Sequence, residues 1–80
     1  MPEGKQTTLT RMQAGQRGTV VQIQGSHRVI GRLSALGVRP GKRITKVSSM
    51  FMHGPITIQL GTTHVAIGFG MANKIIVGLD

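Results

Sequence analysis

Glycine interrupts this chain at short intervals, and the segments between the glycines alternate between apolar and polar side chains. The sequence has 12 glycines in 80 residues. In residues 18–24 and 56–60 the apolar residues recur at every second position, which is the pattern of a half-buried β-strand. Short strands between glycine-rich turns are typical of a small barrel or sandwich. We therefore expect one all-β domain, a barrel of about five to six short strands.

The same alternation predicts where the strands lie. Besides these two segments, strands are expected at residues 43–47, 65–69 and 74–79, with a single 3₁₀ turn at residues 70–73. In residues 43–47 strict alternation would place Lys46 on the same face as Ile44. A bulge or sharp bend is therefore expected in this strand, as tight barrels require at their corners.

One helix is expected in the middle of the chain, from His27 to Leu36. Its four large aliphatic residues recur at helical spacing, which gives the helix one apolar face. Ser26 is suited to cap the first turn, and Gly37 is suited to end the helix in a left-handed conformation. Pro40 and the glycine that follows it then predict a turn into the next strand.

Positive charge dominates the composition. Ten Lys and Arg residues against two acidic residues give a formal net charge of +8. This charge favours an acidic partner: nucleic acid, a membrane surface or an acidic protein face. Phe51 and Phe69 are the only aromatic rings on which bases could stack. Six basic residues lie close together in the sequence and predict a positive surface patch: Arg28, Arg32, Arg39, Lys42, Arg43 and Lys46.

The residues present do not support enzyme chemistry. The lack of cysteine excludes disulfides, thiolate metal sites and a cysteine nucleophile. The two acidic residues, Glu3 and Asp80, stand near opposite ends of the sequence, so no paired carboxylate is available. The run from Gly37 to Arg43 lacks the spacing of a phosphate-binding loop, because three residues instead of four separate its glycines. We expect neither catalytic residues nor a cofactor.

The segment from Arg32 to Gly41 resembles the signature of a known family. It reads Arg-Leu-Ser-Ala-Leu-Gly-Val-Arg-Pro-Gly and is followed by Ile44. This is similar to the RL-x-x-LG-hydrophobic-x-PG motif of the FeoA family, the small ferrous iron transport protein A. Residues 12–20, 54–58 and 65–77 resemble the family in the same order, so the resemblance spans residues 9–79. Lys46 departs from it, because many relatives have an apolar residue there.

The resemblance implies an SH3-like β-barrel with one short helix lying against it. In this reading, residues 9–80 form the domain and residues 1–8 form a flexible segment before it. The resemblance also implies a cytoplasmic, non-enzymatic regulatory protein of ferrous iron uptake. Its partner would be the membrane ferrous iron transporter, which the protein meets at the transporter's cytoplasmic GTP-binding part. Weak self-association stays open, and the family has no established catalytic residues to carry over.

Two segments are candidates for the docking surface. The first is the corner after the helix with its nearby basic residues, namely Arg32, Leu36, Arg39, Lys42 and Arg43. The second is the apolar run Met50, Phe51 and Met52, because Met-rich surfaces adapt to partners, although these side chains could instead close the mouth of the barrel. Within the family motif we expect a structural role for Leu33, Gly37, Pro40 and Gly41.

Two alternative functions remain. A nucleic-acid-binding SH3-like barrel is supported by the charge of +8 and opposed by the scarcity of aromatic residues and the lack of a recognition helix. A metal-sensing module would use His27, His53 and His64 as ligands of a transition metal. These histidines are weak candidates, because they are isolated in the sequence and have almost no carboxylate support.

Overall fold

The computed structural model describes residues 5–49 and 54–80 of the chain. Within these residues, six strands form one antiparallel sheet in the order β1-β6-β2-β3-β4-β5. The strands are β1 (Gln6–Thr8), β2 (Arg17–Ile23), β3 (Arg43–Ser49), β4 (Ile56–Leu60), β5 (Thr63–Ile67) and β6 (Ile75–Leu79). The helical segments are η1 (Leu9–Arg11), α1 (His27–Ala35) and α2 (Phe69–Ala72). The predicted mainly β fold with one short helix is confirmed.

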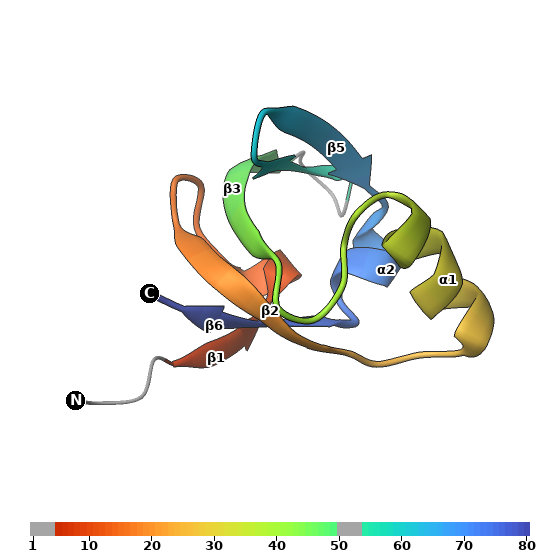
Figure 1. Ribbon diagram of the computed structural model, residues 1–80. Helices are drawn as coiled ribbons and strands as arrows, with labels where there is room; N and C mark the ends of the chain where they lie inside the picture. Colours follow the sequence, from red (N-terminus) through yellow and green to blue (C-terminus); the bar gives the residue numbers. More distant parts are fainter. Residues whose placement is uncertain (1–4, 50–53) are drawn as a thin grey trace.

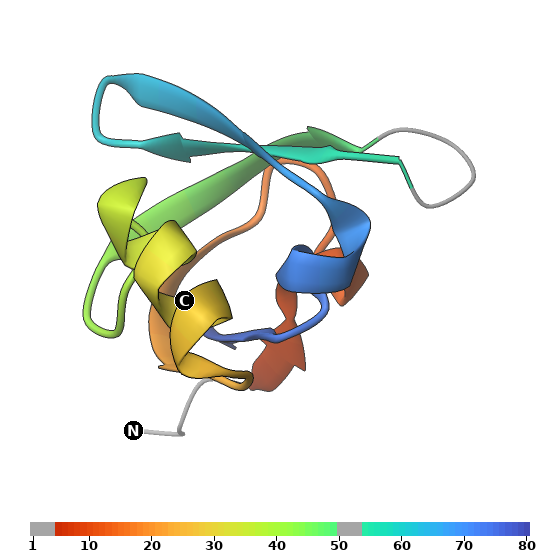
Figure 2. The ribbon, with the colours of Figure 1, turned by 90° about the vertical axis from the view of Figure 1, so that its right-hand side faces the viewer.

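The sheet curls around its own apolar face into a partly open barrel (Figure 1). The β4–β5 hairpin lies over the layer of β1, β6 and β2, and α1 and α2 occupy the side between these two layers (Figure 2). The buried core is aliphatic and consists of Leu9, Met12, Val20, Ile23, Leu33, Val38, Ile44, Ile56, Ile58, Ile67, Ala72, Ile75 and Val77. Helix α1 contributes a single fully buried side chain to this core, so the sheet supplies most of it.

Helix α1 begins at the predicted residue and ends at Ala35, one residue before the predicted end, with Leu36 as its C-cap. The hydroxyl of Ser26 accepts a hydrogen bond from the Val29 backbone N–H at 3.3 Å, which caps the first turn. At the other end Gly37 has φ +94°, its N–H donates to the Ser34 carbonyl, and the Val38 N–H donates to the Leu33 carbonyl. This pair of bonds is a Schellman motif, and the accompanying apolar contact is formed by Leu33 and Val38, both fully buried.

Several boundaries differ from the predictions, and three differences change how an element is assigned. The first described strand lies at Gln6–Thr8, in a segment where no strand was predicted, because β1 pairs with β6 through backbone hydrogen bonds that its polar sequence does not reveal. The strand expected to reach Phe69 ends at Ile67. Phe69 instead begins α2, which replaces the 3₁₀ turn expected at residues 70–73.

The predicted bulge in β3 is present, but its consequence for Lys46 was wrongly predicted. The register against β4 shifts between Lys46 and Ser48, and Val47 between them is 40% exposed. Ile44 and Lys46 therefore both face the interior. Lys46 is 2% exposed and does not belong to the positive surface patch in which the sequence placed it.

Lys46, which belongs to β3, binds the segment that connects β1 to β2. Its Nζ donates to the Leu9 carbonyl at 3.2 Å, to the Thr10 carbonyl at 3.3 Å and to the Met12 carbonyl. Its backbone N–H and carbonyl also bond to residues just before β2. Burial disfavours the charged ammonium and lowers the pKa of Lys46 below its usual value. The three carbonyls supply the hydrogen bonds that a buried cation requires.

Gly18 in β2 leaves no room for a side chain between this strand and β6. A Cβ atom at this position would lie 2.5 Å from the carbonyl oxygen of Gly78 and 2.6 Å from Cγ1 of Val77. Both distances are shorter than a van der Waals contact, and one of the two atoms belongs to the backbone. Gly18 therefore sets the spacing between β2 and β6.

We expect Lys46→Met to lower the free energy of unfolding by about 2–3 kcal/mol, because buried carbonyls would lose their donor while the side chain keeps a similar length. Urea unfolding monitored by circular dichroism measures the change. A variant as stable as the wild type would contradict the role assigned to the ammonium.

The pH dependence of the unfolding free energy, measured for the wild type and for Lys46→Met, provides the control. Since the folded pKa of Lys46 lies below 10.5, the unfolded chain binds more protons between the folded pKa and 10.5. The unfolding free energy of the wild type should therefore rise as the pH increases through this window. Lys46→Met should lack this part of the rise.

Gly18→Ala should destabilise the fold by roughly 1–3 kcal/mol, because β2 and β6 must separate to admit the methyl group. The matched control is Gly31→Ala in α1, where a Cβ would meet no atom within 4 Å. Gly31→Ala should stabilise the protein by about 0.5–1 kcal/mol through helix propensity. Thermal unfolding of both variants tests the prediction, which fails if the two shifts have the same sign.

Candidate protein-docking surface

A continuous turn carries three of the predicted docking residues. After α1 the chain reverses at Gly37, buries Val38 and turns again at Gly41, which has φ +93°. The Gly41 N–H donates to the Val20 carbonyl at 2.8 Å, and the Lys42 carbonyl accepts from the Val20 N–H at 2.8 Å. The turn is therefore bonded to β2 on one side. Three side chains of the turn are exposed to solvent, namely Leu36, Arg39 and Lys42.

These side chains surround a shallow hollow next to the β4–β5 hairpin. The hollow has a volume of about 340 Å³ and is lined by Leu36, Gly37, Arg39, Lys42, Arg43, Leu60, Gly61 and Thr63. Leu36 is 44% exposed although it is a large apolar residue. Four of the predicted docking residues thus meet at one place, where an apolar surface adjoins cationic groups.

An exposed ion pair lies beside the hollow. Nη1 of Arg43 donates to Oδ1 of Asp80 at 3.0 Å, and Nη2 contacts Oδ2. The hydrogen bond and the charge of Asp80 raise the pKa of Arg43, and the hydrogen bond from Arg43 lowers the pKa of Asp80. Since both side chains are largely in solvent, water and salt screen the pair.

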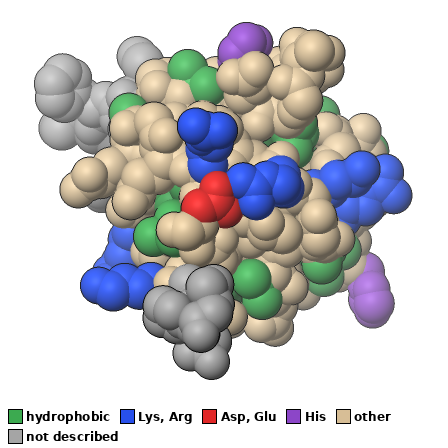
Figure 3. All heavy atoms as spheres, turned by 60° about the vertical axis from the view of Figure 1, so that its left-hand side comes forward, with side chains coloured by type: hydrophobic (Ala, Val, Ile, Leu, Met, Phe, Trp, Pro, Cys, Tyr) green, Lys and Arg blue, Asp and Glu red, His purple; other side chains and the backbone are tan. Residues whose placement is uncertain are grey.

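The rest of the positive charge on this face is unpaired. Asp80 is the one acidic residue in the part of the chain that the structure describes, and it pairs with Arg43. Arg39 and Lys42 form no side-chain hydrogen bond or ion pair with any described residue. Figure 3 shows the basic side chains around the red carboxylate on this face. Such a face attracts acidic groups of a partner.

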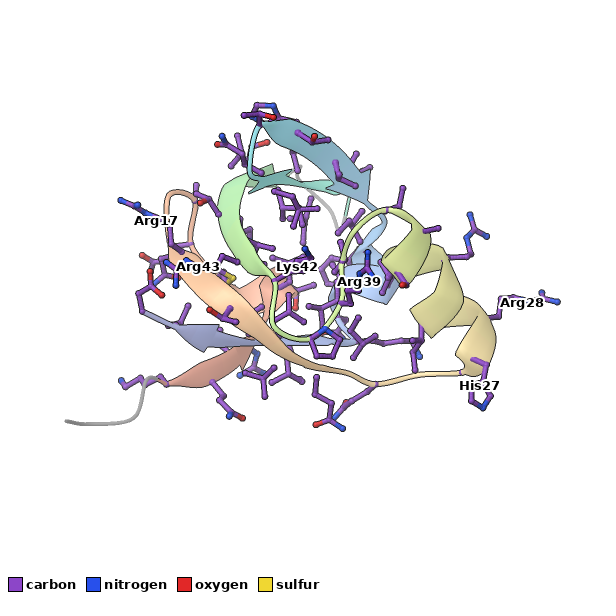
Figure 4. The ribbon with its side chains drawn as sticks, viewed as in Figure 1. Arg17, His27, Arg28, Arg39, Lys42 and Arg43 are labelled. Carbon is purple, nitrogen blue, oxygen red and sulfur yellow. The ribbon has the colours of Figure 1, made fainter. Side chains whose placement is uncertain are left out.

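Sequence reasoning missed Arg17. This residue begins β2 and pairs in register with Thr45, which brings its side chain to the same end of the sheet as Arg43 (Figure 4). The two arginines help to line a second hollow of about 560 Å³, which shares Arg43 and Gly61 with the first. No local pattern could have indicated Arg17, because only the pairing of β2 with β3 places it there.

The predicted basic patch is divided in the structure. Arg28 lies at the far end of α1, away from Arg39 and Lys42 (Figure 4). Arg32 is exposed in the last part of α1 and does not line the hollow. Lys46 is buried, as described above. The second docking candidate, Met50, Phe51 and Met52, lies outside the described residues.

The histidines do not form a metal site in residues 5–49 and 54–80. His27 and His64 are exposed and belong to different elements, α1 and β5, while His53 lies outside the described residues. In this part of the chain no group of three His, Cys, Asp or Glu residues could hold a metal ion. Also within it, no helix is both long enough and apolar enough to cross a membrane.

Comparison with known proteins identifies the family. A profile described as the FeoA domain matches residues 7–79. The structure is similar to that of an iron uptake regulatory protein named FeoA, with a TM-score of 0.89 and 34% sequence identity, over 95% of this chain and 100% of the other. A search among curated proteins gave no match.

More distant structures share the fold. The FeoA protein of Chlorobium tepidum has a TM-score of 0.82 at 22% identity, over 91% of this chain and 70% of the other. A manganese-dependent transcriptional repressor has a TM-score of 0.88 at 20% identity, over 100% of this chain and 45% of the other. The resemblance noted in the sequence is confirmed: this chain belongs to the FeoA domain family, whose members are non-enzymatic proteins associated with ferrous iron uptake.

Proposed function

We propose that this protein is a regulatory docking module of the ferrous iron transporter and binds the transporter's cytoplasmic GTP-binding domain. It acts in the cytoplasm and reaches the membrane through this partner. The observation that carries the proposal is the meeting of exposed Leu36 with the unpaired cations Arg39 and Lys42 around one hollow, in a chain of the FeoA family.

The chemistry of this surface supports protein binding. The buried centre of a protein interface is more apolar than the rest of the surface, and arginine is enriched in interfaces. The surrounding positive charge would speed association with an acidic face and set its orientation. Both contributions are present on the same turn, which is bonded to β2 and is anchored by the buried Val38 in its middle.

Regulation would follow from selective binding. A docking protein shifts the equilibrium between two states of its partner only if it binds one state more tightly. A GTP-binding domain changes conformation when the nucleotide is hydrolysed, and it therefore offers two such states. We expect this protein to have different affinities for the GTP-bound and GDP-bound forms of the domain.

The test is an NMR titration of the isotope-labelled protein with the isolated cytoplasmic domain of its transporter at physiological salt. Shifts should concentrate at residues 36–43 and 60–63, around the hollow. Leu36→Ser and Arg39→Ala should each weaken binding about tenfold. The control Arg28→Ala removes an exposed arginine at the far end of α1 and should bind as the wild type does.

A duplex oligonucleotide runs in parallel, because the charge of +8 also suits nucleic acid. Binding of the oligonucleotide alone, weakening steeply with salt, would overturn the proposal in favour of nucleic-acid binding. Equal losses of affinity in Arg28→Ala and Arg39→Ala would show a diffuse attraction without a specific docking surface. Absence of binding to the transporter domain would reject the proposal.

A further inference from the structure

Strand β5 is an open edge of the sheet, and it lacks the features that usually protect such an edge. In the described residues it is last in the strand order and pairs only with β4, over five residues without a bulge. Its sequence, Thr-His-Val-Ala-Ile, contains no proline, lysine or acidic residue. Edge strands are normally blocked by such features, because their free backbone groups can pair with another strand. The opposite edge, β1, has only three residues.

The geometry of the hairpin shows which backbone groups of β5 are free. A two-residue turn connects β4 to β5, and Gly61 has φ +59°, which suits its first position. The closing pair of such a hairpin, Leu60 and Thr63, is hydrogen-bonded, and the bonded pairs then alternate along the ladder. The backbone N–H and C=O groups of His64 and Ala66 therefore point away from β4. No backbone bond to another described element involves either residue.

This edge leads directly to the cationic hollow. Thr63, the first residue of β5, lines the hollow together with Arg39 and Lys42. At about 3.3 Å per residue, Ala66 lies roughly 10 Å along the strand from Thr63. A segment of four or so residues that pairs with β5 would thus have one end beside the unpaired cations and Leu36.

We propose that an extended acidic segment of a partner protein adds to the sheet as a new strand beside β5. Its backbone pairs with His64 and Ala66, its acidic side chains reach Arg39 and Lys42, and an apolar side chain covers Leu36. This inference rests on the proposed function in that the partner is a protein. When a peptide adds to a sheet as a strand, its backbone hydrogen bonds provide the affinity, and its side chains at alternate positions provide the selectivity.

Charge complementarity selects this occupant over a second copy of the chain. Two copies would each bring a net charge of +8, and in the described part of each copy Asp80 is the one carboxylate, already paired with Arg43. Arg39 and Lys42 would then stay without partners. An acidic segment supplies the missing counter-charges and occupies the free edge at the same time.

The direct test blocks the edge without breaking the hairpin. In Ala66→Pro the lost N–H is one that faces away from β4, so the β4–β5 ladder is retained. The matched control is Ala66→Thr, which keeps the N–H in a residue suited to strands. Binding is measured by NMR with a short synthetic peptide of alternating valine and glutamate. A peptide of alternating valine and lysine is the charge control.

We expect the glutamate peptide to shift residues 63–67 together with Arg39 and Lys42, and to slow hydrogen exchange at the Ala66 amide. Ala66→Thr should bind as the wild type does, and Ala66→Pro should bind roughly tenfold more weakly or worse. The double variant Arg39→Ala, Lys42→Ala should lose the preference for glutamate over lysine. Equal binding of Ala66→Pro and the wild type, or equal binding of the two peptides, would overturn the inference.

A second measurement leaves the protein unchanged, in case Ala66→Pro does not fold. One peptide carries N-methyl groups on the valines and another carries them on the glutamates. Because only alternate N–H groups of an added strand face β5, one methylated peptide should lose binding and the other should keep it. Loss in both or in neither contradicts strand addition. The absence of binding at millimolar peptide also contradicts it. A dimer of the free protein in sedimentation that Ala66→Pro abolishes would overturn the acidic segment as the occupant, because a second copy would then fill the edge.

The transporter domain separates this inference from the proposed function. If the domain binds the wild type and Ala66→Pro equally well, the docking function stands and strand addition is rejected. If the domain binds neither while the glutamate peptide binds only the wild type, strand addition stands and the transporter is rejected as the partner.

Discussion

The ammonium of Lys46 is bound by the backbone carbonyls of the segment that links β1 to β2, and this contact ties that segment to β3 in the interior of the protein. It joins the first strands of the chain to the middle of the sheet, across a barrel whose two edge strands do not pair with each other. An apolar side chain could fill the same space, but it would leave the three carbonyls without this donor. The contact is short-ranged and geometrically specific, in contrast to the aliphatic core around it.

Local patterns explain how much of the fold could be predicted. Helix α1 was predictable because its limits are set by neighbours in the sequence, Ser26 at one end and Gly37 at the other. For Lys46, alternation indicated the inner face, but charge indicated the surface. Lys46 is buried because carbonyls far away in the sequence bind its ammonium, and no local pattern reveals them. The same reason separates Leu36, which lies on one continuous turn and was predicted, from Arg17, which reaches the site only through strand pairing.

The positive charge of this face is distributed unevenly. The one ion pair between described residues, formed by Arg43 and Asp80, neutralises the middle of the basic face and leaves Arg39 and Lys42 with their full charge next to the hairpin. At physiological salt, charges act over about 8 Å, so a partner senses this part of the surface only when it is nearly in contact. In the proposed docking, attraction would therefore guide the final approach, and the shape of the hollow with its apolar Leu36 would determine what stays bound.

Val38 lies on the turn between the exposed residues Leu36 and Arg39, yet it is fully buried. The turn that carries Leu36 and Arg39 is thus held by a core side chain in its middle and by backbone bonds to β2 beyond it. A loop held in this way has little conformational freedom to lose when a ligand arrives, so the entropic cost of binding is small. The same rigidity would set a limit on the proposed docking: this surface would select among partners by fit and would not change its shape around them. Any substitution at Val38 would therefore change recognition by loosening the turn, without touching a bound partner.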